Sequence, residues 1–329
     1  MKKELYQKEE SKFFYENRYK KGYMDEWPIL KKQRVFEVIK SLNLPESGNA
    51  LDFGCGNGVF TDVLRQALPK WKIYGCDIST VSIDNAKNRF PTCSFFVSDN
   101  EKISDIKFDF LFSHHVLEHV FDIEKTIQEI NILLKPKSSV LHIFPCGNKD
   151  SFEYNVCKIR MDGINREMEN RFFFEEEGHI RRLTTEQTNL LMNKYGFSLE
   201  KDFYSNQYYG ALKWITQTIN PKFIMEFTNH RKAIDKASNN SLLLMRFNLL
   251  LLYILQLPSC VFIRTREELS KDKGLKQKMK YYCVLILVLI PFFISYPAYA
   301  IMNYYANKEW NYSKHLKNGS EMYLFYNRK

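Results

Sequence analysis

One acid and three glycines stand close together in residues 50–61, ALDFGCGNGVFT, and could hold a charged ligand. They are Asp52, Gly54, Gly56 and Gly58. The apolar residues on both sides predict a buried strand, a tight turn and a helix that starts at Val59, which brings backbone N–H groups close to a ligand. A dinucleotide fingerprint would need its third glycine at position 59, and no lysine follows the turn to bind a phosphate. The simpler alternative is a glycine turn that only closes a β–α unit.

A second carboxylate, Asp77, lies at the end of the strand predicted for residues 72–78. It follows the last glycine by about 20 residues, where an open α/β sheet places the group that accepts hydrogen bonds from a ribose. The competing interpretation is a plain N-cap for the helix predicted for residues 80–90. On the first interpretation, Asp77 binds the ribose of a nucleoside ligand.

Four histidines are candidates for a general base, which an oxygen nucleophile needs in order to lose its proton. His114, His115 and His119 follow the strand predicted for residues 108–113, and His179 precedes the last predicted helix. A positioned base typically contributes about 10²- to 10⁴-fold to a rate. We predict His179 and His115 as the catalytic residues. The alternative for each is a histidine that only holds a loop.

Residues 50–61 resemble motif I of the class I S-adenosylmethionine-dependent methyltransferases, and VLEHVFDIEKTIQEINILLKPKSSVLHIFP resembles the family's segment after the fourth strand. The resemblance implies S-adenosylmethionine as the cofactor. Its amino-acid end would lie at the glycines, its ribose at Asp77 and its adenine at Asp99, for which a solvent-facing turn is the alternative. The implied cofactor-binding residues are Asp52, Gly54, Cys55, Gly56, Gly58, Asp77, Ile78, Asp99, Asn100 and His114. Glu118 and His119 match a frequent turn of the family, which favours a structural role for both.

A bound divalent metal is an alternative use of the same turn. Some relatives bind such an ion through Glu-x-x-Glu-His, and this chain has His115, Glu118 and His119 at that spacing. Imidazole is a good ligand for Zn, Mn or Fe and a poor one for Mg. We predict no metal, and loss of activity after exhaustive chelation would contradict that prediction.

The order of predicted elements is that of a doubly wound, Rossmann-like α/β fold. The first strand opens the stretch 50–61, and further strands are predicted in residues 72–78, 94–98, 108–113, 135–146, 197–203 and 320–329. The resemblance implies a seven-stranded sheet that is mostly parallel with an antiparallel last strand. The predicted methyltransferase domain is residues 1–205 with 319–329. Residues 206–318 are predicted to be a helical, hydrophobic, membrane-associated insertion.

The net charge of +10 is concentrated at the end of the chain, because residues 241–329 carry 13 Lys and Arg against 5 Asp and Glu. This fits an anionic membrane surface better than a nucleic acid, which would need cations around the catalytic cleft. A basic loop, 264–280, separates two apolar runs, 242–263 and 281–302, of roughly bilayer-spanning length. Two crossings would put that loop outside, against the positive-inside tendency. We therefore favour attachment to the cytoplasmic face without crossing. A membrane-crossing hairpin and two buried helices of a soluble domain are the alternatives.

The leading functional hypothesis is O-methylation of a membrane-proximal small molecule, such as a glycan, a lipid or a quinone intermediate. The predicted partners are this small-molecule or lipid-linked acceptor and an anionic membrane surface. A nucleic-acid methyltransferase is the second hypothesis, although SHHVLEHV stands where amino-methylating DNA enzymes have an Asn/Asp-Pro-Pro-aromatic turn. A non-catalytic membrane module that binds S-adenosylmethionine is the third.

Overall fold

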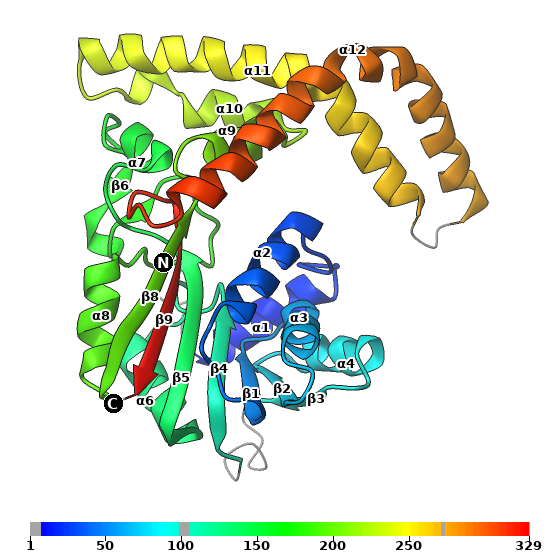
Figure 1. Cartoon of the computed structure of the whole chain (residues 1–329). Coiled ribbons are helices and arrows are strands. Elements are labelled where there is room, and N and C mark those ends of the chain that lie inside the picture. The colour runs from blue at the N-terminus through cyan, green and yellow to red at the C-terminus, as the bar shows by residue number, and fades with distance from the viewer. Residues whose placement is uncertain (1–7, 99–105, 271–273, 329) are drawn as a thin grey trace. The chain divides into compact units, whose positions relative to one another are not determined.

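Two units share the chain, and the computed structural model describes residues 8–98, 106–270 and 274–328 of it (Figure 1). The first, which we call the sheet unit, comprises residues 1–145, 177–202 and 322–329. The second, the helical unit, comprises residues 146–176 and 203–321.

Seven strands form the large sheet, in the order β3-β2-β1-β4-β5-β9-β8. Their bounds are β1 Asn49–Phe53, β2 Lys72–Asp77, β3 Ser94–Val97, β4 Phe108–His114, β5 Leu134–Pro145, β8 Phe197–Ser205 and β9 Glu321–Arg328. β1 pairs in parallel with both β2 and β4, which sets Asp52 opposite Gly75 and Phe112. The last strand, β9, runs antiparallel between β5 and β8. The predicted seven-stranded, doubly wound fold is therefore confirmed.

Helices pack on this sheet through apolar positions spaced for one helix face. The described helices of the sheet unit are α1 Lys8–Tyr19, α2 Ile29–Lys40, α3 Val59–Ala67, α4 Thr80–Arg89, α6 Ile123–Leu133 and α8 Thr185–Asn193. α8 starts with the side chains of Thr184 and Gln187 in a reciprocal capping box. The strand order reverses between β1 and β4, and an open α/β sheet binds its ligands at such a point, outside the carboxyl ends of the strands.

The helical unit is built mainly from helices that follow β8. Its elements are α7 Phe152–Cys157, β6 Ile164–Asn165, η2 Arg166–Met168, β7 Arg171–Phe172, α9 Tyr209–Thr216, α10 Pro221–Phe227, η3 His230–Lys232, α11 Lys236–Leu269 and α12 Leu275–Ser313. Phe152, Ile215, Phe227 and Leu249 belong to its hydrophobic core. α11 and α12 contain the two predicted apolar runs, and each is long and apolar enough to cross a membrane by length and composition alone.

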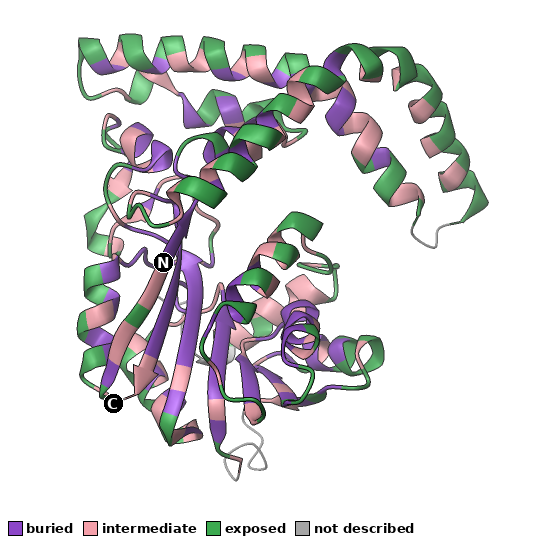
Figure 2. Ribbon diagram, in the orientation of Figure 1, coloured by how far each residue is buried: buried purple, intermediate pink, exposed green. Residues whose placement is uncertain are grey.

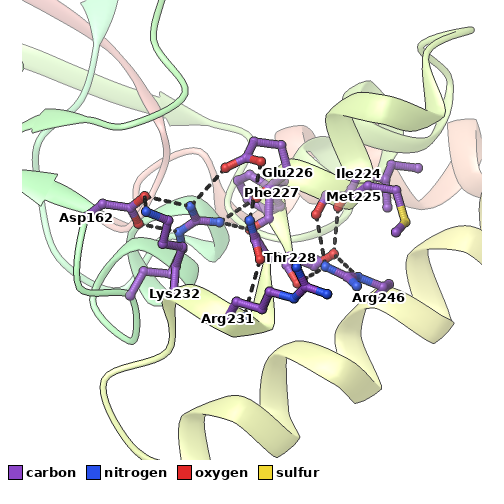
Figure 3. Close-up of polar contacts among 11 residues, drawn as sticks. Asp162, Ile224, Met225, Glu226, Phe227, Thr228, Arg231, Lys232 and Arg246 are labelled. Atoms are coloured by element: carbon purple, nitrogen blue, oxygen red, sulfur yellow. Dashed lines mark hydrogen bonds and ion pairs between the residues drawn. The ribbon is translucent and has the colours of Figure 1, made fainter.

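Two arginines fix the turn after α10 (Figure 3). Arg160 is buried, pairs with Asp162 at 3.0 Å and donates to the carbonyl oxygen of Phe227 at 3.1 Å. Arg246, which lies inside the first apolar run, donates to the carbonyl oxygens of Thr228 at 2.8 Å and of Met225 at 3.0 Å. The charge within this run is thus satisfied by the end of α10, so that one face of α11 is fixed against protein.

The N-terminus of α9 is capped by a carboxylate from α12. Glu309 accepts hydrogen bonds from the N–H groups of Tyr208, Tyr209 and Gly210 at 2.7–3.0 Å. Hydrogen bonds to a charged group are worth about 1.5–3 kcal/mol each, and a neutral amide would keep only part of that. We expect Glu309→Gln to lower the free energy of unfolding by roughly 1–3 kcal/mol. Urea unfolding followed by circular dichroism measures this loss. An unchanged midpoint, equal to that of the control Glu267→Gln at an exposed acid, would contradict the expectation.

Candidate functional site

The glycine turn after β1 is packed so closely that a Cβ atom at Gly54, Gly56 or Gly58 would lie within 3.0 Å of a neighbouring side chain. Gly54, Gly56 and Gly58 all have positive φ angles, of 76°, 50° and 79°. Residues other than glycine rarely adopt such angles. The N–H groups of Gly54 and Cys55 donate to the carbonyl oxygen of Cys76 at 2.8 and 2.9 Å. The turn therefore follows the backbone of β2 closely, and Cys55 is buried within it.

Asp52 is buried under this turn. Its carboxylate accepts a hydrogen bond from the Thr61 hydroxyl at 2.6 Å, which ties β1 to the first turn of α3. Burial raises the pKa of Asp52 to about 7. The hydrogen bond from the Thr61 hydroxyl lowers this pKa, and the negative charge of the nearby Asp77 raises it further. A buried acid with so little compensation is suited to a cationic partner.

Asp77 ends β2 and lies beside the glycine turn. Its carboxylate accepts the N–H groups of Gly56 and of Ser79, both at 2.9 Å. Burial raises its pKa, while these two amides act in the opposite direction. The next residue, Ile78, is half-buried. The structure thus brings together the glycine turn and the strand-end acid that the sequence singled out. Asp99 and Asn100, predicted for the adenine, lie outside the described residues.

A strap formed by residues 15–27 crosses the carboxyl ends of the strands in the sheet unit. Tyr19 is close to the glycine turn, since a Cβ atom at Gly56 would lie 2.8 Å from its hydroxyl. Further along, Asn57 donates through its side chain to the Asp25 carboxylate at 2.9 Å. Trp27 packs edge-on against His114 with 4.7 Å between ring centroids. The sequence places aromatic and charged residues alternately here, but that pattern alone did not identify Tyr19 and Trp27 as site residues.

His114 and His115 extend the site from the end of β4. The His114 ring lies 4.0 Å from the ring of Phe60, between α3 and the strap. His115 has a φ of 54°, an angle that is uncommon for a residue with a side chain and is often found at functional sites. Its Nδ1 lies 2.8 Å from a carboxylate oxygen of Glu118. The Glu118 side chain is 1% exposed and that of His115 is 24% exposed, so a buried acid holds a partly accessible imidazole.

Glu118 is surrounded by imidazole rings. Burial by itself would raise its pKa, but His115 first, and His119 and His179 with it, lower the pKa of Glu118 to about 2. The acid is therefore ionised at neutral pH and favours positive charge on its neighbours. His119 is hydrogen-bonded through Nδ1 to the Tyr15 hydroxyl at 2.8 Å. Its ring centroid lies 4.6 Å from that of His179.

Two of these histidines and Glu118 form a group that would suit a transition metal. His115, Glu118 and His179 each offer one ligand atom, and these atoms lie within 4.8 Å of one another. The sequence pattern suggested His119 as the third ligand, whereas the fold places His179 in that position within the sheet unit. Two imidazoles and one carboxylate suit Zn, Mn or Fe. The absence of a metal stays a prediction, for which chelation is the test.

Comparison with known proteins places residues 28–202 in a family described as a methyltransferase domain. A malonyl-[acyl-carrier protein] O-methyltransferase of Ilyobacter polytropus is 25% identical over 193 residues, which are 57% of this chain and 70% of the relative. The juvenile hormone acid O-methyltransferase of Bombyx mori is 27% identical over 215 residues, 58% of this chain and 77% of that protein. The solved structure of the YcgJ protein of Bacillus subtilis has a TM-score of 0.44 at 13% identity and covers 64% of this chain and 88% of its own. The matched range 28–202 includes all the candidate site residues described above from Asp52 to His179.

Proposed function

Since this chain belongs to the class I S-adenosylmethionine-dependent methyltransferases, we propose that it methylates an oxygen atom of a small molecule at the surface of a membrane. The observation that carries the choice of oxygen is the pairing of His115 with the buried Glu118 at 2.8 Å beside the cofactor crevice. The two relatives described above are named O-methyltransferases, which supports the same choice.

The residues at the strand ends fit S-adenosylmethionine. The buried Asp52 suits the cationic amino-acid end, and Asp77 offers carboxylate oxygens to the ribose. The positive φ angles of Gly54, Gly56 and Gly58 shape the turn between the two acids. Cys55, Ile78 and His114 would complete the contacts of the described residues. When bound, the cofactor supplies a methyl group on a sulfonium, and the protein's own share of the work is alignment and proton removal.

In this proposal His115 removes the proton of the acceptor hydroxyl. Glu118 holds the imidazole by Nδ1, the orientation in which Nε2 takes up a proton, and it stabilises the imidazolium that results. The Trp27 ring, 5.7 Å from that of His115, limits its rotation. His179 also lies in this cluster, with a ligand atom within 4.8 Å of those of His115 and Glu118 and its ring 4.6 Å from that of His119. We assign it to the border of the acceptor pocket, with a smaller part in catalysis than His115.

The acceptor would be a glycan, a lipid or a quinone intermediate at the cytoplasmic face. Support for this location comes from the two apolar helices and the basic segment between them, all within the predicted insertion 206–318. A lipid-linked acceptor would share the membrane with that insertion.

Transfer of label from S-adenosylmethionine tests the proposal. Purified full-length protein is incubated with methyl-labelled cofactor and a chloroform–methanol extract of cell membranes, and in parallel with total RNA. We expect label in the lipid extract that survives mild alkali, as a methyl ether does. Alkali-labile label would indicate a methyl ester, hence a carboxylate acceptor that needs no base. Label in RNA alone would overturn the proposal.

Asp52 should make cofactor affinity depend on pH. Its pKa is raised to about 7, so the carboxyl group holds a proton at lower pH. The ammonium group of the cofactor favours the ionised form and lowers this pKa, so binding below pH 7 releases a proton. Affinity should therefore rise with pH from about 5 to about 7, by up to ~10-fold per unit. Calorimetry at about pH 6 in two buffers of different ionisation enthalpy measures the number of protons released on binding. The dependence should vanish in Asp52→Asn, and a flat profile in the wild type would contradict the assignment.

A further inference from the structure

We propose that the helical unit binds one leaflet of an anionic membrane, with the part of α11 before Pro258 lying in the plane of the surface and the bend of α12 inserted, so that neither helix crosses the bilayer. The inference deepens the proposed function by naming the lipid partner and the mode of contact. It rests on the proposed membrane location and not on methyl transfer, so the two can fail separately.

One face of α11 is fixed against protein by polar bonds. The buried side chain of Gln256 donates to the Thr216 hydroxyl of α9 at 3.2 Å and accepts from Gln217 at 3.0 Å. Arg246 is bonded to the end of α10, as described above. Polar groups in the middle of a membrane-spanning helix would need such partners inside the hydrocarbon. These partners belong to the folded part of the unit, so α11 lies along its surface.

The opposite face of α11 is apolar, and Figure 2 shows exposed residues along this helix. Its exposed side chains recur every three or four positions and thus share one helix face. They are Leu243, Leu244, Phe247, Leu251, Ile254 and Leu255. Leu244 and Phe247 are 63% and 65% exposed. A helix with protein on one side and a continuous apolar stripe on the other matches the form of a helix that lies in the membrane interface.

α12 has the composition of a membrane span but not its straight length. Pro291 and Pro297 lie within it, and the helix is bent (Figure 1). The charge-free part before the first proline, residues 281–290, would rise about 15 Å at 1.5 Å per residue. A hydrocarbon core is about 30 Å thick, so this part reaches across one leaflet only. Exposed apolar side chains cluster on both sides of the first proline, including Ile286, Leu287, Ile290, Phe293 and Ile294.

The charges beside these surfaces identify an anionic lipid as the occupant. Arg266, Lys276 and Lys280 are exposed where α11 ends and α12 begins. A cation near an anionic surface strengthens binding by roughly 5-fold. A second copy of the chain on the same face would bring its own cations into the contact. An anionic leaflet therefore matches both the apolar stripe and the positive charge beside it. A second copy of the chain would match only the apolar stripe.

Vesicle flotation of the full-length protein tests the partner. We use vesicles of phosphatidylcholine alone and with about a third of phosphatidylglycerol. Leu244→Ser with Phe247→Ser should weaken binding to both by roughly 10-fold or more, because two apolar side chains no longer enter the leaflet. Lys276→Gln with Lys280→Gln should weaken binding only to the anionic vesicles, by roughly 10-fold or more. The control Leu190→Ser, at an exposed apolar residue of the sheet unit, should change neither. Equal binding by all variants, or a stable dimer in place of vesicle binding, would overturn the proposal.

Thiol labelling distinguishes one leaflet from two crossings. Cys283 is the exposed cysteine among seven, so Cys283→Ser removes the accessible thiol and Gly274→Cys places one at the start of α12. The variant is added to preformed anionic vesicles and treated with a membrane-impermeant maleimide. Labelling before detergent is expected, because the connection between the helices stays on the outer side. Labelling only after detergent would show that the hairpin crosses the bilayer, even if flotation succeeds.

Discussion

Asp77→Asn should weaken S-adenosylmethionine binding by on the order of 10²-fold. The carboxylate at the end of β2 can accept two hydrogen bonds from a ribose diol, and each is stronger when the acceptor is charged. Gly56 donates to one oxygen of this carboxylate and Ser79 to the other, so the amide keeps only one of the two bonds. A melting curve recorded beside the titration therefore checks that the variant is folded. Calorimetric titration with S-adenosylmethionine and with S-adenosylhomocysteine measures the effect, which should be equal for both because they carry the same ribose.

Asp109→Asn is the matched control. Asp109 lies on β4 of the same sheet, where it accepts the N–H of Asn49 at 2.9 Å and pairs with Lys135 at 2.8 Å. Its substitution should lower stability without changing cofactor affinity. Asp77→Asn protein that binds within about twofold of the wild type would show that Asp77 only caps α4.

Glu118→Gln should slow methyl transfer by about 10²- to 10⁴-fold while leaving cofactor affinity unchanged. A neutral amide cannot stabilise the imidazolium of His115 and can hold the ring in the wrong tautomer. His115→Gln should cost at least as much, and His179→Gln less. The rate of label transfer to the membrane extract under saturating cofactor measures all three.

A pH profile separates catalysis from a merely structural role. The wild-type rate should fall at acid pH, where an imidazole base becomes protonated, and the slow residual rate of His115→Gln should lack this fall. His230→Gln, in the helical unit, is the control with unchanged rate. A Glu118→Gln variant that melts earlier but transfers label at the wild-type rate and pH profile would assign Glu118 to the fold alone.

Local sequence patterns predicted the strand ends because each is fixed by a few neighbouring residues. The glycine turn needs positive φ angles at three positions, and only glycine adopts such angles readily. The three glycines in residues 54–58 therefore predict the conformation of the turn from the local sequence. The capping box at Thr184 and Gln187 likewise involves only four consecutive residues. The final strand was predicted from the fold's need for a seventh strand, and β9 fills that place.

Contacts between distant residues were not predictable in this way. α9 is a short helix whose capping acid, Glu309, comes from 99 residues after Gly210. Trp27 packs on His114 and His115, which are almost 90 residues further along the chain. The aromatic residue alone does not predict which distant residues it contacts. The third histidine of the cluster was also not predictable, because the loop that carries His179 returns to the end of β4 from far along the chain. This loop places His179, and not His119, in one group with His115 and Glu118.

The proposed function depends most on Asp52, the glycine turn and Asp77 forming one site for S-adenosylmethionine. Calorimetric titration of the full-length wild-type protein tests it most directly. We expect one binding site per chain, with proton release below about pH 7 that disappears in Asp52→Asn. No heat of binding from a folded protein, or binding that neither Asp52→Asn nor Asp77→Asn alters, would contradict it.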